Sequence, residues 1–539
     1  MSDVLDHLAD ALALQRQGRL AEAEAGYRAV LSAEPEQAIA LHLLGLLTLQ
    51  AGRAVEAAAL LREAARLRPG DADTSLALAR ACAESGDLAE AEALYRATLQ
   101  REPSHRVALA GLATALLRAG RPAEAFAVAG RAVEAGPEWA EAWFLRGTAA
   151  RALGRPAEAA EALRCAVALA PAHAAAWLNL GNAMADLDNL AAAEAHLRRA
   201  IACDPASAEA HSGLGVVLTA VGRLGDAVAA CDAAIALQPD FAPAYWNRSF
   251  AHLLAGDFTQ GFRDYEWRRR RPGHARACLP GAEWRGEDLA GRTLLVHGEQ
   301  GLGDAIQFAR YLPLLAASAG QVVLACAAPL APLLEQLPVR VVPRDGPYPA
   351  ADFHVDQMSL PLLLGTEPHR IPAAAGYLRA DRRRAAAIRA GLPDGRRVGI
   401  VWSGNPAHGN DMRRSMPTAA LAPVLAADAC FVSLQVGPRA PEITRLFGLP
   451  DHAARLTDFA ETAAWVETLD LVIAVDTSTA HLAGAMGRPV WVMLPYAPDW
   501  RWMTGRADSP WYASMRLFRQ SAPGDWPGVT AAVAEALRG

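Results

Sequence analysis

The feature that most constrains the fold of this chain is a strict 34-residue period over its first half. One position of the period holds glycine, with aspartate in the sixth copy: Gly18, Gly52, Gly86, Gly120, Gly154, Asp188, Gly222 and Gly256. Five residues later comes alanine, with glycine in the last copy: Ala23, Ala57, Ala91, Ala125, Ala159, Ala193, Ala227 and Gly261. Proline follows twelve residues further on, at Pro35, Pro69, Pro103, Pro137, Pro171, Pro205 and Pro239, and one residue late at Pro272. Eight in-phase copies indicate a repeat architecture.

Each repeated position has a physical role in a pair of packed helices. The glycine ends the first helix, the alanine lets the two helices approach closely, and the proline stops the second helix. The pattern predicts eight helix–turn–helix units over residues 1–273, stacked into an all-α, right-handed solenoid with a concave face. This region resembles the tetratricopeptide repeat (TPR), and such arrays usually bind a protein or a peptide.

The concave face of the predicted solenoid has few polar anchors. In many such arrays an asparagine at the sixth position of the first helix grips a peptide backbone, but here only Asn179 and Asn247 occupy that position. We therefore expect a mostly apolar groove of small residues. Trp139, Trp143 and Trp177 either contribute to this groove or belong to the core between the helices.

Charge and cysteine usage exclude several classes of protein. A net charge of −6 and a pI near 6.2 argue against a general nucleic-acid binder. The basic run 268–271 is expected to end a helix, where cations are favoured, rather than to bind phosphate. Seven cysteines without a CxxC pair indicate neither a metal site nor a disulfide framework. With no signal peptide and no membrane-spanning stretch in the sequence, we expect a cytoplasmic protein.

From Thr293 onward, alternating strand and helix patterns predict two Rossmann-like α/β lobes with mostly parallel sheets. Strands are expected at 293–297, 321–326, 339–343, 397–402, 429–434, 470–475 and 489–494. Helices are expected at 305–318, 381–390, 417–426, 459–469, 477–486 and 527–537. A joint rich in Pro and Gly covers 274–291, the first lobe 292–392, and the second lobe with its terminal helix 393–539.

A glycine-rich loop follows the first predicted strand. Gly298, Gly301 and Gly303 permit positive φ angles and the close approach of a ligand, and Asp304 places a carboxylate where the next helix begins. A dinucleotide fingerprint would need a third glycine where Ile306 stands, which disfavours a dehydrogenase. The chain also lacks the GxxxxGK[ST] motif, which excludes a P-loop kinase or ATPase.

A second turn, DTSTAH, follows the sixth predicted strand. Asp476 is expected to cap the next helix, while Thr477, Ser478 and Thr479 offer hydroxyl groups beside free backbone N–H groups. Together with His481 these groups would hold a phosphate at the start of the helix. The alternative is a capped, buried helix with a satisfied core histidine.

A third polar loop follows the fourth predicted strand. Ser403 and Asn405 are potential donors to a ligand, and Arg414 can neutralise a diphosphate. The alternative for this loop alone is an exposed basic segment. Because parallel α/β sheets bind ligands at the carboxyl ends of their strands, three such turns in one half of the chain favour a ligand site.

These turns carry a resemblance that extends over residues 290–525. The glycine-rich turn ending in Asp304, the stretch RSMP at 414–417 and the run DTSTAHLAGA at 476–485 resemble the heptosyltransferase-like glycosyltransferases. Members of this inverting GT-B family extend bacterial lipopolysaccharide cores. The joined layout is also similar to that of protein O-glycosylating enzymes, in which such repeats present a polypeptide acceptor to a GT-B domain.

The resemblance implies a role for each matching residue. Asp304 corresponds to the proposed catalytic base, and Arg414 stands in place of the lysine that meets the donor phosphates. The turn that binds the donor diphosphate corresponds to Thr477, Ser478, Thr479 and His481. Two positions depart from the family pattern, because Met416 replaces the tryptophan of the K-x-W-P motif and Thr479 replaces the usual glycine.

The sequence therefore predicts a glycosyltransferase that moves a sugar from a nucleotide-sugar donor to a protein recruited by the array, or to a glycan. Asp304 is the predicted base, and the predicted donor site consists of Gly301, Gly303, Ser403, Asn405, Arg414, Asp476, Thr477, Ser478, Thr479 and His481. No DxD stands at a strand end of the second half, so this scheme needs no metal and no cofactor besides the donor. The alternatives are a non-catalytic scaffold with a degenerate nucleotide-binding domain, and a sensor that couples nucleotide binding to partner binding.

Overall fold

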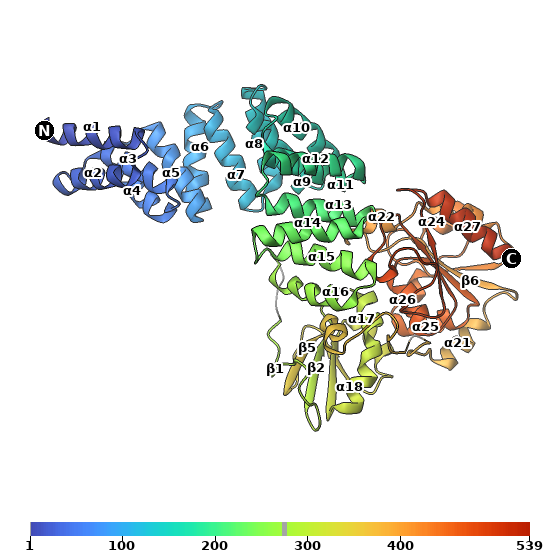
Figure 1. Ribbon diagram of the computed structural model, residues 1–539. Coiled ribbons are helices and arrows are strands. Elements are labelled where there is room, and N and C mark those ends of the chain that lie inside the picture. Colours follow the sequence, from blue (N-terminus) through green and yellow to red (C-terminus); the bar gives the residue numbers. More distant parts are fainter. Residues whose placement is uncertain (1, 272–276, 374) are drawn as a thin grey trace. The chain divides into compact units, whose positions relative to one another are not determined.

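The structure is a computed structural model that describes residues 2–271, 277–373 and 375–539 (Figure 1). The chain divides into two compact units, Met1–Ala210 and His211–Gly539. Within the described ranges no helix combines the length and the apolar character that a bilayer-spanning segment requires.

Paired helices follow the predicted period through the first half of the chain. The first pairs are α1 (Ser2–Arg16), α2 (Leu20–Ala33), α3 (Ala38–Gln50), α4 (Ala54–Leu67), α5 (Ala72–Ser85), α6 (Leu88–Arg101), α7 (Arg106–Arg118), α8 (Pro122–Ala135), α9 (Ala140–Ala152), α10 (Pro156–Leu169), α11 (Ala174–Asp186) and α12 (Leu190–Cys203). The pattern continues with α13 (Ala208–Ala220), α14 (Leu224–Leu237), α15 (Ala242–Ala255) and α16 (Phe258–Tyr265). Across the described residues 2–265, the eight predicted helix pairs are confirmed.

The repeated positions have the predicted roles. The repeat glycines adopt positive φ where the first helix of each pair ends: Gly18, Gly52, Gly86, Gly120, Gly154, Gly222 and Gly256. Asp188 takes the same left-handed conformation, with φ of 60°. The repeat alanines from Ala23 to Ala227 are fully buried. In the last repeat, where glycine replaces alanine, a Cβ on Gly261 would lie 2.5 Å from Cγ of Leu253.

A substitution at Gly154 can measure the free-energy cost of placing a side chain in this left-handed turn. Its φ is +70°, and nothing lies within 4 Å of the position that a Cβ would occupy. Gly154→Ala is therefore expected to lower the free energy of unfolding by about 1 kcal/mol through backbone strain alone. Gly130 in α8 has equally open surroundings but lies within the helix. The control Gly130→Ala should raise stability by up to about 1 kcal/mol in the same urea titration, and equal effects at both positions would contradict this account.

Side chains that were candidates for the concave face make bonds within the array. The Asn179 amide donates to Oγ1 of Thr148 in the preceding repeat at 3.0 Å. The indole N–H of Trp143 donates to the carbonyl oxygen of Pro137 at 2.9 Å, and the indole of Trp177 makes the equivalent bond to Pro171 one period later. Trp143 and Trp177 therefore tie the first helix of a repeat to the proline that ends the previous one.

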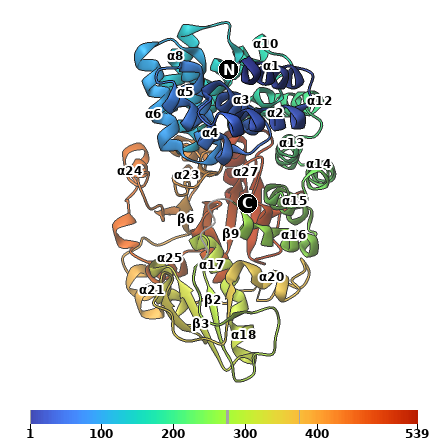
Figure 2. The same cartoon turned by 90° about the vertical axis from the view of Figure 1, so that its left-hand side faces the viewer.

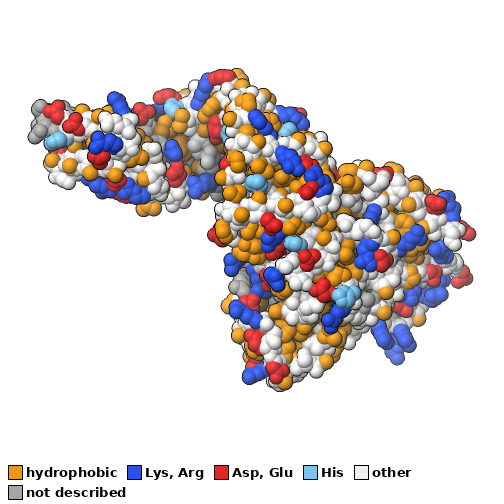
Figure 3. Space-filling view, viewed as in Figure 1, with side chains coloured by type: hydrophobic (Ala, Val, Ile, Leu, Met, Phe, Trp, Pro, Cys, Tyr) orange, Lys and Arg blue, Asp and Glu red, His pale blue; other side chains and the backbone are white. Residues whose placement is uncertain are grey.

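Arginine–glutamate pairs connect the second helices of successive repeats in the first unit. Arg28 pairs with Glu56 at 2.6 Å, and Arg62 pairs with Glu90 at 2.6 Å one period later. On the face shown in Figure 3, basic and acidic side chains are interspersed. These exposed pairs add little stability each, but they neutralise much of the local charge of the helices that carry them.

Two parallel, five-stranded sheets follow the repeats (Figures 1 and 2). The first has the order β1-β5-β2-β3-β4, with β1 (Ala282–Glu283), β2 (Thr293–His297), β3 (Gln321–Cys326), β4 (Arg340–Pro343) and β5 (Phe353–Asp356). The second has the order β10-β9-β8-β6-β7, with β6 (Arg397–Val401), β7 (Cys430–Ser433), β8 (Leu471–Val475), β9 (Val490–Leu494) and β10 (Met515–Arg519). The predicted strands and their parallel arrangement are confirmed, whereas β1, β5 and β10 were not predicted.

Helices cover these sheets. They are α17 (Leu302–Phe308), α18 (Leu312–Ser318), α19 (Ala331–Leu334), α20 (Leu360–Leu363), α21 (Arg382–Arg389), α22 (Asp411–Arg414), α23 (Ala422–Leu425), α24 (Glu442–Phe447), α25 (Phe459–Glu467), α26 (Ser478–Ala485) and α27 (Trp526–Arg538). The single helix predicted at 305–318 is broken by a 3-10 turn at Ala309–Tyr311. Pro313 lies in the first turn of α18, where its missing N–H is tolerated but from where it cannot continue the preceding helix.

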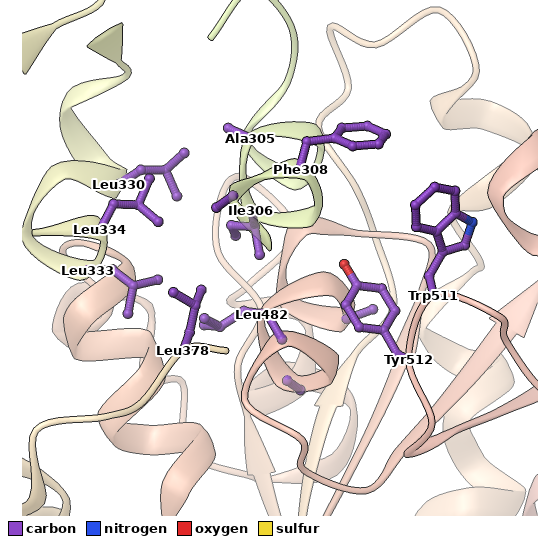
Figure 4. Close-up of a cluster of buried hydrophobic side chains, with 14 of the residues drawn as sticks. Ala305, Ile306, Phe308, Leu330, Leu333, Leu334, Leu378, Leu482, Trp511 and Tyr512 are labelled. Carbon is purple, nitrogen blue, oxygen red and sulfur yellow. The ribbon is translucent and has the colours of Figure 1, made fainter. Parts of the chain in front are cut away.

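One hydrophobic core joins the last repeat to both lobes of the second unit. The rings of Phe258 and Phe262 in α16 lie 5.5 Å from Trp511 and 5.6 Å from Trp500, respectively. Phe308 of the first lobe meets Trp511 at 5.7 Å. Figure 4 shows side chains of α17 together with Leu482 of α26, Trp511 and Tyr512. The last repeat therefore belongs to the same compact unit as the two sheets.

Candidate functional site

Polar side chains from four strand ends converge where the two lobes meet. The loop after β2 leads into α17 of the first lobe, and the loops after β6, β8 and β9 leave three adjacent strands of the second sheet. A Cβ on Gly303 would lie 2.9 Å from Cδ2 of His481 and 3.5 Å from Cα of Ser478. The missing side chain at Gly303 thus lets α17 approach α26 at the carboxyl ends of the strands, where α/β sheets bind ligands.

Asp304 lies in the first turn of α17. Its Oδ2 accepts a hydrogen bond of 2.9 Å from the Gly301 backbone N–H, and its Oδ1 pairs with Nη2 of Arg501. Arg501 also donates to Oε1 of Gln307 at 2.7 Å and pairs with Asp499 at 2.8 Å. The Asp304 side chain is 23% exposed. Its carboxylate is therefore held in a fixed direction and remains accessible to a substrate.

The glycines of this loop serve close packing. None of Gly298, Gly301 and Gly303 has a positive φ, so the loop does not use the left-handed conformations that glycine permits. A Cβ on Gly298 would lie 3.0 Å from the carbonyl oxygen of Ala325, and one on Gly301 would lie 3.0 Å from Oδ2 of Asp304. The atoms that approach these glycines are those of the protein itself.

The second turn contains a pair formed by the buried His481 and by Asp476, whose side chain is 15% exposed. The N-cap of α26 is Thr477, with extended φ and ψ of −143° and 164°, and not Asp476 as predicted. Nε2 of His481 lies 3.8 Å from Oδ1 of Asp476, and its Nδ1 lies 3.0 Å from the Tyr512 hydroxyl. The imidazole also stacks on Trp502, with ring centroids 5.3 Å apart. His481 is therefore a buried, hydrogen-bonded histidine that faces a carboxylate.

Burial determines the charge of this pair. Burial raises the pKa of Asp476 to about 6, and the nearby Asp499 carboxylate acts in the same direction. Burial lowers the pKa of His481 well below its ordinary value, and Arg501 and Arg414 add to this effect. The imidazole is therefore neutral at neutral pH, and the positive charge near the second turn comes from arginines.

The hydroxyl groups of the second turn differ in their availability. Oγ1 of Thr477 donates to the Val475 carbonyl oxygen at 3.2 Å, which uses its proton locally. Ser478 at the first position of α26 is half-buried, whereas Thr479 is buried. Ser478 and the first backbone N–H groups of α26 are thus the donors of this turn that a ligand can reach most readily.

Hydrogen bonds within the protein hold the loop after β6, and one partner, Gln435, lies just after β7. Oε1 of Gln435 accepts from the backbone N–H of Ser403 at 2.9 Å, and its Nε2 donates to the Ser403 carbonyl oxygen at 3.0 Å. Oδ1 of Asn405 accepts from the Ala407 N–H at 3.0 Å. Ser403 is buried, and the Asn405 side chain is used in a local turn.

Arg414 is the residue of this loop whose charge affects the ionisable groups of the second turn. Its Nε donates to Oδ1 of Asp411 at 3.3 Å, and a Cβ on Gly404 would lie 2.7 Å from its guanidinium group. The positive charge of Arg414 lowers the pKa of both Asp476 and His481. The structure therefore brings Asp304, Arg414, Asp476 and His481 into one electrostatic cluster.

Sequence reasoning missed the residues that the loop after β9 contributes. Arg501 pairs with both Asp499 and Asp304, and the Tyr512 hydroxyl bonds to His481. These residues lie in the aromatic stretch 496–512, which carries no recognised spacing of catalytic groups. The sequence offered one indication of their role. This stretch follows a strand of the same sheet as two of the other turns, and such strand ends are where α/β sheets bind ligands.

Comparisons with known proteins match the repeat array. One family model described as tetratricopeptide repeat matches residues 8–72, 144–208 and 186–242, and a second with the same description matches 48–98 and 83–147. Protein FlbA of Caulobacter vibrioides is 30% identical over 370 residues, which cover 56% of this chain and 62% of FlbA. The chain thus matches about three fifths of the length of this curated relative.

Two solved structures align with segments of this chain at low overall similarity. A tetratricopeptide repeat protein from Parabacteroides merdae aligns over 47% of this chain and 99% of its own, with 15% identity and a TM-score of 0.41. MamA from Desulfovibrio magneticus RS-1 aligns over 31% of this chain and 95% of its own, with 25% identity and a TM-score of 0.29. Together with the helix pairs and the matching family models, the 34-residue period identifies the N-terminal part of this chain as an array of tetratricopeptide repeats.

Proposed function

We propose that this chain is a nucleotide-sugar-dependent glycosyltransferase whose repeats recruit a protein acceptor. The observation that carries the proposal is the approach of α17 to α26 at Gly303, which places Asp304 beside the turn that contains Asp476 and His481. Two parallel sheets that face each other with their carboxyl strand ends are an arrangement that suits a nucleotide donor. The likeness of the motifs to heptosyltransferase-like enzymes points to the same chemistry.

The donor diphosphate would bind to the second lobe. The first N–H groups of α26 and the partly exposed Ser478 can donate to phosphate oxygens, and Arg414 supplies positive charge beside them. Arg414 stands where the resembled family has lysine. This chain contains no lysine at all, so arginine is the strong cation that it uses everywhere.

Transfer would proceed by direct displacement at the anomeric carbon. Asp304 takes the proton from the acceptor group as a new bond forms between that group and the sugar. The bond between the sugar and the diphosphate breaks at the same centre, and the leaving phosphate keeps the electron pair. Arg414 and the N-terminus of α26 stabilise the charge that develops on this phosphate. The sugar is transferred to the acceptor with inversion of configuration at its anomeric carbon. Arginine supplies the cationic side chain of this scheme.

The test is a thermal-shift screen of the full chain against nucleoside diphosphates and their sugars. A ligand that binds only the folded state raises the melting temperature. Arg414→Ala should weaken binding of the responding nucleotide by about tenfold or more, the usual loss for a hydrogen bond to a charged group. Arg516→Ala, which removes an arginine stacked on Trp491 and Phe518, is the control and should keep the shift. The absence of a shift with every nucleotide would contradict the proposal.

Asp476 provides a pH signature of the donor site. Its pKa of about 6 means that it is ionised at neutral pH, where its charge repels a diphosphate, and neutral at lower pH. The affinity of the wild type relative to Asp476→Asn should therefore rise a few-fold between about pH 7.5 and about pH 5.5. Isothermal titration calorimetry of both proteins with one nucleotide measures the two affinities at each pH. Protonation of the nucleotide's own phosphate affects both proteins equally and therefore cancels in their ratio. Parallel pH profiles would contradict a diphosphate site beside Asp476.

A non-catalytic interaction scaffold is the second candidate. It is favoured by the repeats, which generally bind proteins or peptides, and by the local bonds that already engage Asp304, Ser403 and Asn405. A scaffold would bind its partner without transfer of sugar. The nucleotide screen and the Asp304 variant separate the two functions.

A further inference from the structure

The end of the repeat array contacts the loop that leads into Asp304. The Tyr265 hydroxyl at the end of α16 lies 3.0 to 3.1 Å from the amide group of Gln300. Arg268 in the following 3-10 turn, Glu266–Arg270, donates through Nη2 to Oε1 of Glu299 at 2.6 Å. Two residues of the last repeat thus hold the two residues that directly precede Gly301.

The ion pair between Arg268 and Glu299 is buried. Their side chains are 3% and 6% exposed, respectively. Arg268 also pairs with Glu266 and donates to Oγ of Ser359 at 2.8 Å. The basic run follows the end of α16, as expected, and Arg268 in addition supplies the positive charge for a buried carboxylate of the first lobe. Truncating Arg268 would leave that carboxylate uncompensated and would drive the loop to rearrange.

A second chain of contacts leads from the same repeat to the other side of Asp304. Tyr265 lies against Trp500, with ring centroids 6.2 Å apart, and Phe262 meets Trp500 edge to face. The guanidinium group of Arg501 lies 4.2 Å from the Trp500 ring centroid. Arg501 is the cation that pairs with Asp304. The last repeat therefore supports both the loop that carries Asp304 and the arginine that orients it.

We infer that Tyr265 and Arg268 are positioning residues for Asp304, so that the last repeat is a part of the catalytic centre as well as of the recruitment array. The catalytic consequence of this inference rests on the proposed transferase function. The positional part concerns the conformation of the loop at 298–304 and can be tested without any substrate.

Three substitutions in the full chain test the inference. Tyr265→Phe keeps the packed ring and removes the hydroxyl that meets Gln300. Arg268→Met removes the charge, and Arg268→Lys restores it. Arg248 belongs to the same repeat and pairs with the buried Asp264 at 2.6 Å, so Arg248→Met is a control that removes a different ion pair of this repeat, between α15 and α16.

The first readout is hydrogen–deuterium exchange of the segment 298–305. Tyr265→Phe should accelerate exchange of this segment by about threefold to tenfold, the factor expected for loss of one hydrogen bond. Arg268→Met should accelerate it at least as much, Arg268→Lys should restore part of the protection, and Arg248→Met should leave the segment as in the wild type. Wild-type exchange in Tyr265→Phe, or equal acceleration in Arg248→Met, would overturn the inference.

The second readout separates rate from binding. With the nucleotide that stabilises the wild type, Tyr265→Phe should keep the dissociation constant and lower the transfer rate about tenfold, because Asp304 is displaced while the donor site in the second lobe is intact. A parallel loss of affinity and rate would argue for a general structural role and against positioning. If no nucleotide binds any variant while the loop still responds, the proposed function fails and the positional inference stands.

Discussion

Asp304→Asn is expected to lower the rate of sugar transfer by about 10²- to 10⁴-fold, the range over which a general base contributes. Asparagine has nearly the same shape, and its carbonyl oxygen can still accept the hydrogen bond from the Gly301 N–H. It cannot take a proton from an acceptor, because an amide is far too weak a base near neutral pH. The fold and the dissociation constant for the nucleotide should remain close to those of the wild type, because the predicted phosphate contacts lie in the second lobe.

A structural role for Asp304 makes a different prediction, because the substitution also removes one partner of Arg501. Asp499→Asn is the matched control, since it removes the other carboxylate of the same arginine and retains Asp304. If Asp304 is the base, its substitution should slow transfer far more than that of Asp499 at a similar cost in stability. Similar rates in the two variants would show that the ion pair, and not the proton acceptor, is what the reaction needs. Rate assays with one donor and thermal melts of both variants give this comparison.

Trp511→Ala should have the largest effect on stability, with a loss of about 3 to 5 kcal/mol in the free energy of unfolding of the second unit. The indole is fully buried and meets Phe258 of the last repeat and Phe308 of the first lobe. The guanidinium group of Arg310 also lies 5.3 Å from its ring centroid. The substitution therefore opens a cavity where three parts of the unit meet.

Urea unfolding followed by tryptophan fluorescence measures this loss, and far-ultraviolet circular dichroism follows the helices of the array in the same samples. Because the chain has two compact units, the two probes are expected to report transitions that do not coincide. Trp491 on β9 is half-buried and provides a control of the same volume. Trp491→Ala should cost clearly less, because part of that ring already faces water. Equal losses at the two positions would contradict a central role for Trp511.

The repeat array could be predicted almost completely from the sequence because its signals are local. A glycine such as Gly154 ends a helix through its own φ, and an alanine such as Ala159 is buried against the helix that precedes it. Strands such as β6 and β8 are buried on both faces and could be predicted from their continuous burial pattern. The strands β1, β5 and β10 gave no such apolar run because polar residues interrupt their sequences.

The candidate site was predictable only in part. Asp304 and His481 stand in motifs that can be read within a few residues, and the structure brings their turns together through Gly303. Arg501 is separated from Asp304 by almost two hundred residues, and no spacing in a single sequence encodes that contact. The bonds that occupy Asn405 are equally invisible, because an asparagine in a polar loop suits a ligand contact and a local turn alike.

The shared core of the last repeat and the lobes has a consequence for any bound acceptor. Helix α15 of that repeat shares a hydrophobic core with Trp500, so packed side chains connect this helix to the residues around Asp304. A flexible linker would let many residues of a bound acceptor reach Asp304. A binding surface that is packed against the site would bring the same acceptor residue to Asp304 each time. An acceptor polypeptide held in extended form on this repeat would be modified at a fixed number of residues from the segment that is recognised. The last repeat would then set the distance, counted in residues, between the recognised segment and the modified residue. That distance could be measured by mapping the modified residues of several acceptors.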